Sequence, residues 1–178
     1  NATFASNVSG SNGGGIAKGA ATSSGKALKR VVVLGGGPCG LTVAHSLVHM
    51  HEGFHVTIVD TKEYYEDTPS ILRMMVGHDI DHLWPNLNIN FMDIMRGAPN
   101  AEYICGTAAA VRKDHVLVGT TNGIASKIVP YDYLVISTGS RYQSDIKTEG
   151  ASIAHRMEHF ASERTRMHDL SKLSLLCA

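Results

Sequence analysis

Residues 31–40 read Val31-Val32-Val33-Leu34-Gly35-Gly36-Gly37-Pro38-Cys39-Gly40, an apolar run that passes directly into a glycine-rich turn. The apolar run predicts a buried strand, and the apolar residues after the turn recur at the spacing of a helix. These residues are Leu41, Val43, Ala44, Leu47 and Val48. Gly53 predicts the end of the helix, and the run from His55 to Asp60 predicts a second buried strand. This order of strand, turn, helix and strand is typical of a dinucleotide-binding unit.

The spacing of the glycines indicates that the turn holds a pyrophosphate. Gly35 lets the chain leave the strand in a conformation that a side chain would block, and Gly37 lets the backbone approach the phosphates. Gly40 lets the helix pack close to the strands, and Pro38 suits the first helical position because it has no N–H to leave unpaired. The unpaired N–H groups and the helix dipole attract an anion. Asp60 lies 20 residues beyond Gly40, where a carboxylate accepts the hydroxyls of an adenosine ribose.

Length and composition restrict the class of protein. The chain of 178 residues is 43% hydrophobic and 18% charged, long enough for one domain with a core and short for two. Its 16 basic and 16 acidic side chains balance, which gives no electrostatic reason to expect nucleic acid as a partner. No run of about 18 apolar residues predicts a transmembrane span. Cys39, Cys105 and Cys177 suggest neither a disulfide framework nor a zinc site, and indicate an intracellular, cytoplasmic or mitochondrial, location.

The segments on either side of this unit have different characters. Residues 1–27 are rich in Asn, Ser, Gly, Ala and Thr, and we expect a disordered leader without the apolar region of a secretory signal. Residues 70–76 predict a short helix that Ser70 caps. Residues 151–178 form a helical tail with a loose apolar stripe. The stripe consists of Ile153, Met157, Phe160, Met167 and Leu170.

Between these segments the pattern turns to strands. Strands are predicted at 88–92, 103–105, 108–111, 115–118 and 127–129, with Asn122-Gly123 as a hairpin turn between the last two. Tyr133 to Ile136 is a further buried strand, and the small residues after it lie beside the crevice where ligands of parallel sheets bind. The predicted fold class is α/β, a Rossmann-like domain whose parallel sheet carries an inserted antiparallel β-meander.

Three segments resemble a known family. They are the turn at 35–40 with Asp60, the segment 64–73 (YYEDTPSILR) and the segment 131–140 (YDYLVISTGS). Over residues 28 to 170 the chain resembles flavoproteins of the pyridine nucleotide-disulfide oxidoreductase superfamily with two dinucleotide-binding domains. The likeness is strongest to type II NADH dehydrogenases and to apoptosis-inducing-factor-like (ferroptosis-suppressor-like) quinone reductases. It implies FAD as the cofactor, NAD(P)H as the electron donor and a quinone or other small electron acceptor.

The resemblance also implies which residues hold FAD. The turn would bind the pyrophosphate, Asp60 the adenosine ribose with Lys62 close by, and Arg73 the flavin nucleotide. The backbone of Ala108 would meet the adenine, and the small-residue turn would pass close to the flavin. The implied cofactor-binding residues are Gly35, Gly36, Gly37, Pro38, Cys39, Gly40, Asp60, Lys62, Arg73, Ala108, Thr138 and Gly139. No side chain is expected to act as a general acid or base, because the cofactor carries the chemistry.

The sequence departs from the family in two ways. No pair of cysteines four residues apart follows Asp60, so we expect no dithiol chemistry. The family also continues after the Phe160 region into a second glycine turn, which binds NAD(P)H, and later into a Gly-Asp segment, and neither occurs here. We therefore expect residues 28–150 to be an FAD-binding domain and 151–178 a helical tail cut at the start of the NAD(P)H-binding domain. Whether a partner chain or a homodimer completes the protein stays open.

Other interpretations stay open. The chain is alternatively a truncated, non-catalytic paralogue that acts as a binding or scaffold module, or a fragment of an NAD-binding Rossmann dehydrogenase. Pairs of histidines four residues apart suggest metal binding, but two imidazoles make an incomplete site and only the stretch His78-Asp79-Ile80-Asp81-His82 adds carboxylates, so surface histidines and no metal site are the better interpretation. They are His45 and His49, His78 and His82, and His155 and His159. Cys39 at a helix start is either redox-sensitive or, as we favour, a packed small residue.

Overall fold

The computed structural model of the chain describes residues 27–50, 53–77, 83–84, 87–120, 126–140 and 152–176. The elements before the sheet's meander are β1 (Lys29–Leu34), α1 (Pro38–His49), β2 (Phe54–Asp60), β3 (Tyr64–Glu66), η1 (Thr68–Ser70), α2 (Ile71–Val76), β4 (Asn88–Asn90) and α4 (Phe91–Ile94). They are followed by β5 (Ala101–Val111), β6 (His115–Thr120), β7 (Ser126–Pro130), β8 (Tyr133–Ile136) and α5 (Ile153–Leu176).

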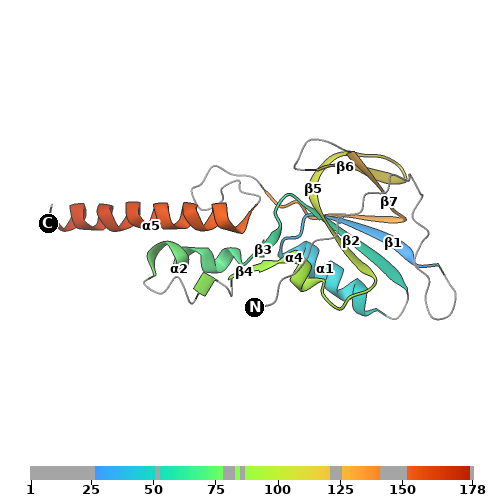
Figure 1. Cartoon of the computed structure of the whole chain (residues 1–178), viewed down its shortest axis with the longest axis horizontal. Coiled ribbons are helices and arrows are strands. Elements are labelled where there is room, and N and C mark those ends of the chain that lie inside the picture. The colour runs from blue at the N-terminus through green and yellow to red at the C-terminus, as the bar shows by residue number, and fades with distance from the viewer. Residues whose placement is uncertain are drawn as a thin grey trace, which may run out of the picture.

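One six-stranded sheet organises the domain, in the order β7-β6-β5-β2-β1-β8. The strands β5, β2, β1 and β8 run parallel to one another, whereas β6 is antiparallel to both β5 and β7. The predicted α/β fold with an inserted meander is therefore confirmed (Figure 1). The strands predicted at 103–105 and 108–111 are one long strand, since β5 pairs with β2 in its first half and with β6 in its second. A shift of register between Ala108 and Ala110 marks a bulge, which bends this strand.

Both faces of the central strands are buried, which explains why β1 is apolar at successive positions. Side chains alternate between the faces of a strand, so Val31 and Val33 pack beneath Ala44 of α1. Val32 and Leu34 pack on the opposite face against the meander. The meander residues buried there are Val116, Val118 and Val129. Helix α1 thus packs on one face of the central strands, and the meander of β5, β6 and β7 packs on the other.

A second, smaller core joins α2 and α5, which lie side by side in Figure 1. Its buried residues are Ile71, Met74, Met75, Trp84, Leu87 and Phe160. The stripe predicted along α5 is correct for Ile153 and Phe160. It is wrong for Met157, Met167 and Leu170, which are 40%, 37% and 48% exposed. The reason is geometric, because α2 has only 6 residues and covers only the first turns of the 24-residue α5.

Two local predictions differ from the structure. The strand predicted at 88–92 ends at Asn90, whose side-chain Oδ1 accepts the N–H of Met92 at 2.8 Å and starts the short helix α4. Ser70 precedes α2, but its side chain does not cap that helix; the hydroxyl donates to the carboxylate of Asp67 instead. The predicted leader and the Asn122-Gly123 turn lie outside the described residues. Within the described ranges, no helix combines the length and apolar character that crossing a bilayer requires.

Candidate functional site

The glycine turn connects β1 to α1 at the carboxyl edge of the sheet. Gly35 has a φ of +96°, which favours glycine, and its N–H donates to the carbonyl of Val59 at 2.8 Å. The helix begins at Pro38 with Gly37 in the N-cap position, where no side chain caps the helix and no acidic residue lies in the first turn. Backbone N–H groups at a helix start lack intrahelical acceptors, and the helix dipole adds positive charge there. The turn therefore favours an anion.

Three glycines of this turn meet different surroundings. A Cβ on Gly40 would lie 1.9 Å from the carbonyl oxygen of Gly35, so only glycine lets α1 pack this closely on the turn. A Cβ on Gly36 would lie 2.4 Å from the ring of Phe91, which fills that side of the turn. A Cβ on Gly37 would meet nothing within 4 Å. Open space thus lies next to Gly37, where the sequence predicts the close approach of a pyrophosphate.

Asp60 lies at the carboxyl end of β2 and is joined to the glycine turn. The N–H of Gly36 donates to Oδ2 of Asp60 at 2.6 Å, and the N–H of Lys62 donates to Oδ1 at 2.9 Å. Each carboxylate oxygen has two lone pairs, so these two bonds leave Asp60 with capacity to accept further hydrogen bonds. The structure thus brings together Asp60, Lys62 and the glycine turn, as the sequence predicted.

The turn after β8 also reaches the glycine turn. Ser137 donates its N–H to the carbonyl of Leu34 at 2.8 Å, and its hydroxyl lies 2.9 Å from the carbonyl of Gly35. A Cβ on Gly35 would lie 3.0 Å from Cα of Thr138, so the backbones of the two turns are in close contact. Gly139 has a φ of +69°, and a Cβ on it would meet nothing within 4 Å. The sequence predicted that Thr138 and Gly139 lie here, but it did not predict that Ser137 holds the two turns together. The only signal was the position of Ser137, directly after the predicted strand 133–136.

Two stacked aromatic rings, of Phe91 and Tyr103, pack next to Gly36 of the glycine turn. The ring of Phe91 is 1% exposed and stacks on the ring of Tyr103 at 4.7 Å between centroids. Burial raises the pKa of the Tyr103 hydroxyl, and this hydroxyl donates to the backbone carbonyl of Lys62. Neither residue was predicted as part of the site, because a single aromatic residue gives no periodic signal.

Two of the predicted cofactor residues, Arg73 and Ala108, have no hydrogen bond or ion pair to the turn within the described ranges. Arg73 lies on α2 with an exposed side chain, whereas Ile71, Met74 and Met75 of the same helix face the second core. Ala108 lies on β5, three residues beyond Cys105, the residue that pairs with Asp60. That separation corresponds to about 10 Å along a strand. A ligand that reached all the predicted residues would therefore be extended along the sheet edge.

The exposure of Cys39 differs from the prediction, and the histidine pairs that the structure describes lie on helices. Cys39 is exposed in the first turn of α1, which contradicts the favoured interpretation of a packed residue. Its side chain points outward because Gly40 supplies the close helix–strand contact. His45 and His49 lie on one face of α1, with ring centroids 4.2 Å apart, and line an apolar hollow of about 370 Å³ beside the helix. His78 and His82 lie outside the described residues, and the described part of the chain gathers no group of three or more His, Cys, Asp or Glu.

The chain is similar to known proteins over most of its length. Residues 29–173 match the sequence pattern of the family described as pyridine nucleotide-disulphide oxidoreductase. The chain is 26% identical over 146 residues to the sulfide-quinone reductase of Aquifex aeolicus, an alignment that covers 80% of this chain and 32% of that protein. It is 27% identical over 150 residues to apoptosis-inducing factor 1 of Saccharomyces cerevisiae, covering 83% of this chain and 36% of the yeast protein.

A solved structure gives the same result for the fold. The sulfide:quinone oxidoreductase from Aquifex aeolicus superposes with a TM-score of 0.62 at 22% identity, covering 81% of this chain and 32% of that chain. The present chain therefore spans about a third of the length of the curated relatives that it matches.

Proposed function

The chain belongs to the pyridine nucleotide-disulphide oxidoreductase family, and on that premise we propose that it is the FAD-binding portion of an NAD(P)H-dependent flavin oxidoreductase. Members of this family are FAD and NAD(P)H dependent. The observation that carries the proposal is the bond from the Gly36 N–H to Asp60 next to the open space at Gly37. It supports the proposal, because a carboxylate that can accept hydrogen bonds from ribose hydroxyls then lies beside a space open to phosphates.

The residues present fit the ADP part of FAD. The first turn of α1 carries no acidic side chain that would repel a pyrophosphate, and Gly37 leaves room for the phosphates to approach. Asp60 keeps acceptor capacity on both carboxylate oxygens. Thr138 and Gly139, in the turn that packs on Gly35, form the proposed wall toward the flavin end, and Ala108 and Arg73 are proposed contacts of the extended cofactor.

The protein's own residues bind and orient in this proposal. The amides of the turn would neutralise phosphate charge, Asp60 would fix the ribose, and Ser137 would hold the two turns together through Gly35. When bound, FAD supplies the capacity to accept electrons from a nicotinamide and pass them on. No side chain of the described residues is assigned a proton-transfer step.

The proposal also covers the limits of the cofactor-binding domain and the electron acceptor. We propose that residues 28–150 form the cofactor-binding domain, with 151–178 leading toward the nicotinamide-binding part of a longer architecture. A quinone is the proposed acceptor, which the name of the Aquifex sulfide-quinone reductase supports by analogy. The chain covers about a third of that relative, so the quinone remains part of the proposal.

Flavin binding by the purified chain tests the proposal. We expect the chain to bind FAD, read as a change in flavin fluorescence on titration, and to discriminate against FMN, because FMN lacks the ADP part that the turn and Asp60 recognise. NADH serves as the competing dinucleotide in a parallel titration.

Three results are informative. FAD bound more tightly than FMN and NADH supports the proposal. NADH bound in preference to FAD would instead support the NAD-binding Rossmann interpretation. A folded chain that binds none of the three would contradict a dinucleotide function altogether.

A further inference from the structure

One peptide group of the glycine turn is held from both of its ends. The peptide that joins Gly35 to Gly36 carries the carbonyl of Gly35 and the N–H of Gly36, and in this trans peptide the two groups point in opposite directions. The hydroxyl of Ser137 lies 2.9 Å from the carbonyl oxygen, and the N–H donates to Oδ2 of Asp60 at 2.6 Å. Ser137 and Asp60 therefore bind the same rigid unit from opposite sides.

The carbonyl of Gly35 depends on the Ser137 hydroxyl for its hydrogen bond. That hydroxyl also lies 3.0 Å from the carbonyl oxygen of Leu34, but this oxygen already accepts the N–H of Ser137 at 2.8 Å. Among the described residues, no backbone N–H donates to the carbonyl of Gly35. Because a carbonyl without a donor is destabilising and the hydroxyl has one proton, Gly35 is the acceptor of that proton.

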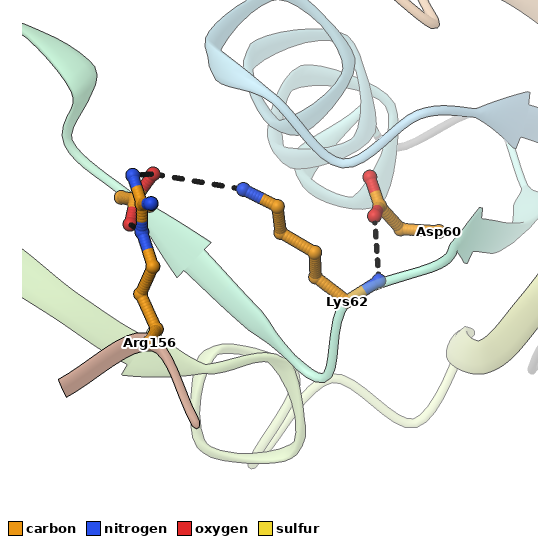
Figure 2. Close-up of polar contacts among 4 residues, drawn as sticks. Asp60, Lys62 and Arg156 are labelled. Atoms are coloured by element: carbon orange, nitrogen blue, oxygen red, sulfur yellow. Dashed lines mark hydrogen bonds and ion pairs between the residues drawn. The ribbon is translucent and has the colours of Figure 1, made fainter. Parts of the chain in front are cut away.

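The N–H of Gly36 has equally little choice of partner. Gly36 is buried, and the ring of Phe91 lies so close that a Cβ would approach it to 2.4 Å. A buried N–H that loses its acceptor costs more than an ordinary hydrogen bond contributes. Asp60 accepts this N–H on one oxygen and the N–H of Lys62 on the other. Figure 2 shows the bond to Lys62, with the other oxygen of Asp60 pointing away from it. The two bonds together fix the carboxylate.

We propose that Ser137 is a positioning residue for Asp60. If the peptide turned about the line between its two Cα atoms, the carbonyl would leave the hydroxyl and the N–H would leave Oδ2 in the same motion. Ser137 thus keeps the Gly36 N–H on Asp60, and through it holds the carboxylate in one orientation for the hydroxyls of a ribose. The step to ribose rests on the proposed function, whereas the coupling of Ser137 to the Gly36 N–H does not.

Hydrogen exchange in the full chain without ligand tests the coupling. In Ser137→Ala the carbonyl of Gly35 loses its donor and the peptide is less restrained, so we expect the Gly36 amide to exchange about tenfold faster. The amide of Arg30 is the internal control, because it also donates to a carboxylate, that of Asp132, at 2.8 Å at the opposite edge of the sheet. The exchange rate of the Arg30 amide should not change.

Two further variants separate the hydrogen bond from the packing. Ser137→Cys fills the same place with a weak donor and should also accelerate exchange at Gly36, which keeps the test decisive if Ser137→Ala does not fold. Ser171→Ala is the matched control, since that hydroxyl also donates to a backbone carbonyl, of His168 at 2.7 Å, but on α5. It should leave exchange at Gly36 unchanged. Circular dichroism checks the fold of each variant.

The step to ribose is tested with two adenine nucleotides. FAD bound to the full chain is displaced by ADP or by dideoxy-ADP, which lacks both ribose hydroxyls, in the wild type and in Ser137→Ala. The affinity for ADP should fall about fivefold, comparable to the loss of one hydrogen bond, while that for dideoxy-ADP changes by less than about twofold.

Each failure has a different meaning. Unchanged exchange at Gly36 in Ser137→Ala, or equal acceleration at Gly36 and Arg30, would reduce Ser137 to a structural residue and overturn the inference. An equal loss of affinity for ADP and dideoxy-ADP would show that Ser137 does not act through the ribose contact, and would overturn it as well. A folded wild type that binds neither FAD nor ADP would contradict the proposed function itself, while the exchange rates would still decide the coupling.

Discussion

Two aspartates at opposite ends of the same sheet show how alike two carboxylates can look in sequence and how differently they are used. Asp132 precedes β8 at the amino edge and accepts the backbone N–H of Arg30 at 2.8 Å and its guanidinium at 2.9 Å. Asp60 ends β2 at the carboxyl edge and accepts two backbone N–H groups, from Gly36 and Lys62. Each carboxylate connects two segments of backbone.

The difference lies in what satisfies the charge. Asp132 has a fixed cation at its side, and the hydrogen bonds from Arg30 hold the pKa of Asp132 below its ordinary value. Asp60 accepts hydrogen bonds from neutral amides on both oxygens, and the Lys62 ammonium lies 3.6 Å from Oε1 of Glu66. The amino edge is therefore complete in itself, whereas the carboxyl edge keeps acceptor capacity and open space for a ligand.

The largest effect is expected within the carboxyl edge, where Gly40→Ala would place a Cβ 1.9 Å from the carbonyl oxygen of Gly35. Such overpacking against backbone should lower the free energy of unfolding by about 3 kcal/mol. Thermal and urea unfolding measure the change.

Gly37→Ala is the matched control, because the site is open and the φ of Gly37, −66°, suits any residue. Its stability should stay within about 1 kcal/mol of the wild type, while FAD affinity falls about tenfold as the Cβ fills the approach of the phosphates. A Gly37→Ala variant with full FAD affinity would show that the open space is not the phosphate site.

A medium effect is expected at the amino edge from Asp132→Asn. Both partners are partly exposed, at 33% for Asp132 and 43% for Arg30, so solvent screening limits the loss to about 1 kcal/mol at neutral pH. Because the pKa of Asp132 is lower in the folded than in the unfolded chain, its contribution is present above the ordinary carboxyl pKa and is lost as the pH falls through the folded value.

Urea unfolding at neutral and acidic pH measures this dependence. The wild type and Asp132→Asn should differ at neutral pH and converge in acid. A difference that grows in acid would contradict the assigned ion pair.

The smallest effect is expected from a surface pair that belongs to neither edge. Lys127 and Glu102 form an ion pair at 2.7 Å with side chains that are 51% and 44% exposed. Lys127→Met should change the free energy of unfolding by about 0.5 kcal/mol or less, and added salt should remove the difference. A change above that of Asp132→Asn would undermine the ranking of the contacts by burial and geometry.

Much of the fold was predictable because local patterns decide it. The continuous apolar runs of β1 and β2 and the glycine spacing after β1 require a parallel unit with a tight turn, and the structure contains it. Predictions failed where tertiary packing or a single side chain decided the outcome. Asn90 ends β4 through one hydrogen bond, and none of the helices that the structure describes packs along the full length of α5.

The site was predictable to a similar degree. Glycines and an acid at fixed spacing are local features, and Gly36 and Asp60 are joined in the structure. The supporting residues are not local. Phe91 reaches Gly36 across 55 positions of sequence, and Ser137 reaches Gly35 across 102, so no spacing rule announces them.

The most direct test of the central claim is a titration of FAD against the wild type, Asp60→Asn and Asp132→Asn, read by flavin fluorescence. Asparagine at position 60 replaces one acceptor oxygen with an NH₂ group, so FAD affinity should fall at least about tenfold. Asp132→Asn should bind FAD as the wild type does, since its carboxylate is already satisfied by Arg30. Equal FAD affinity in all three proteins would contradict the assignment of the carboxyl edge as the cofactor site.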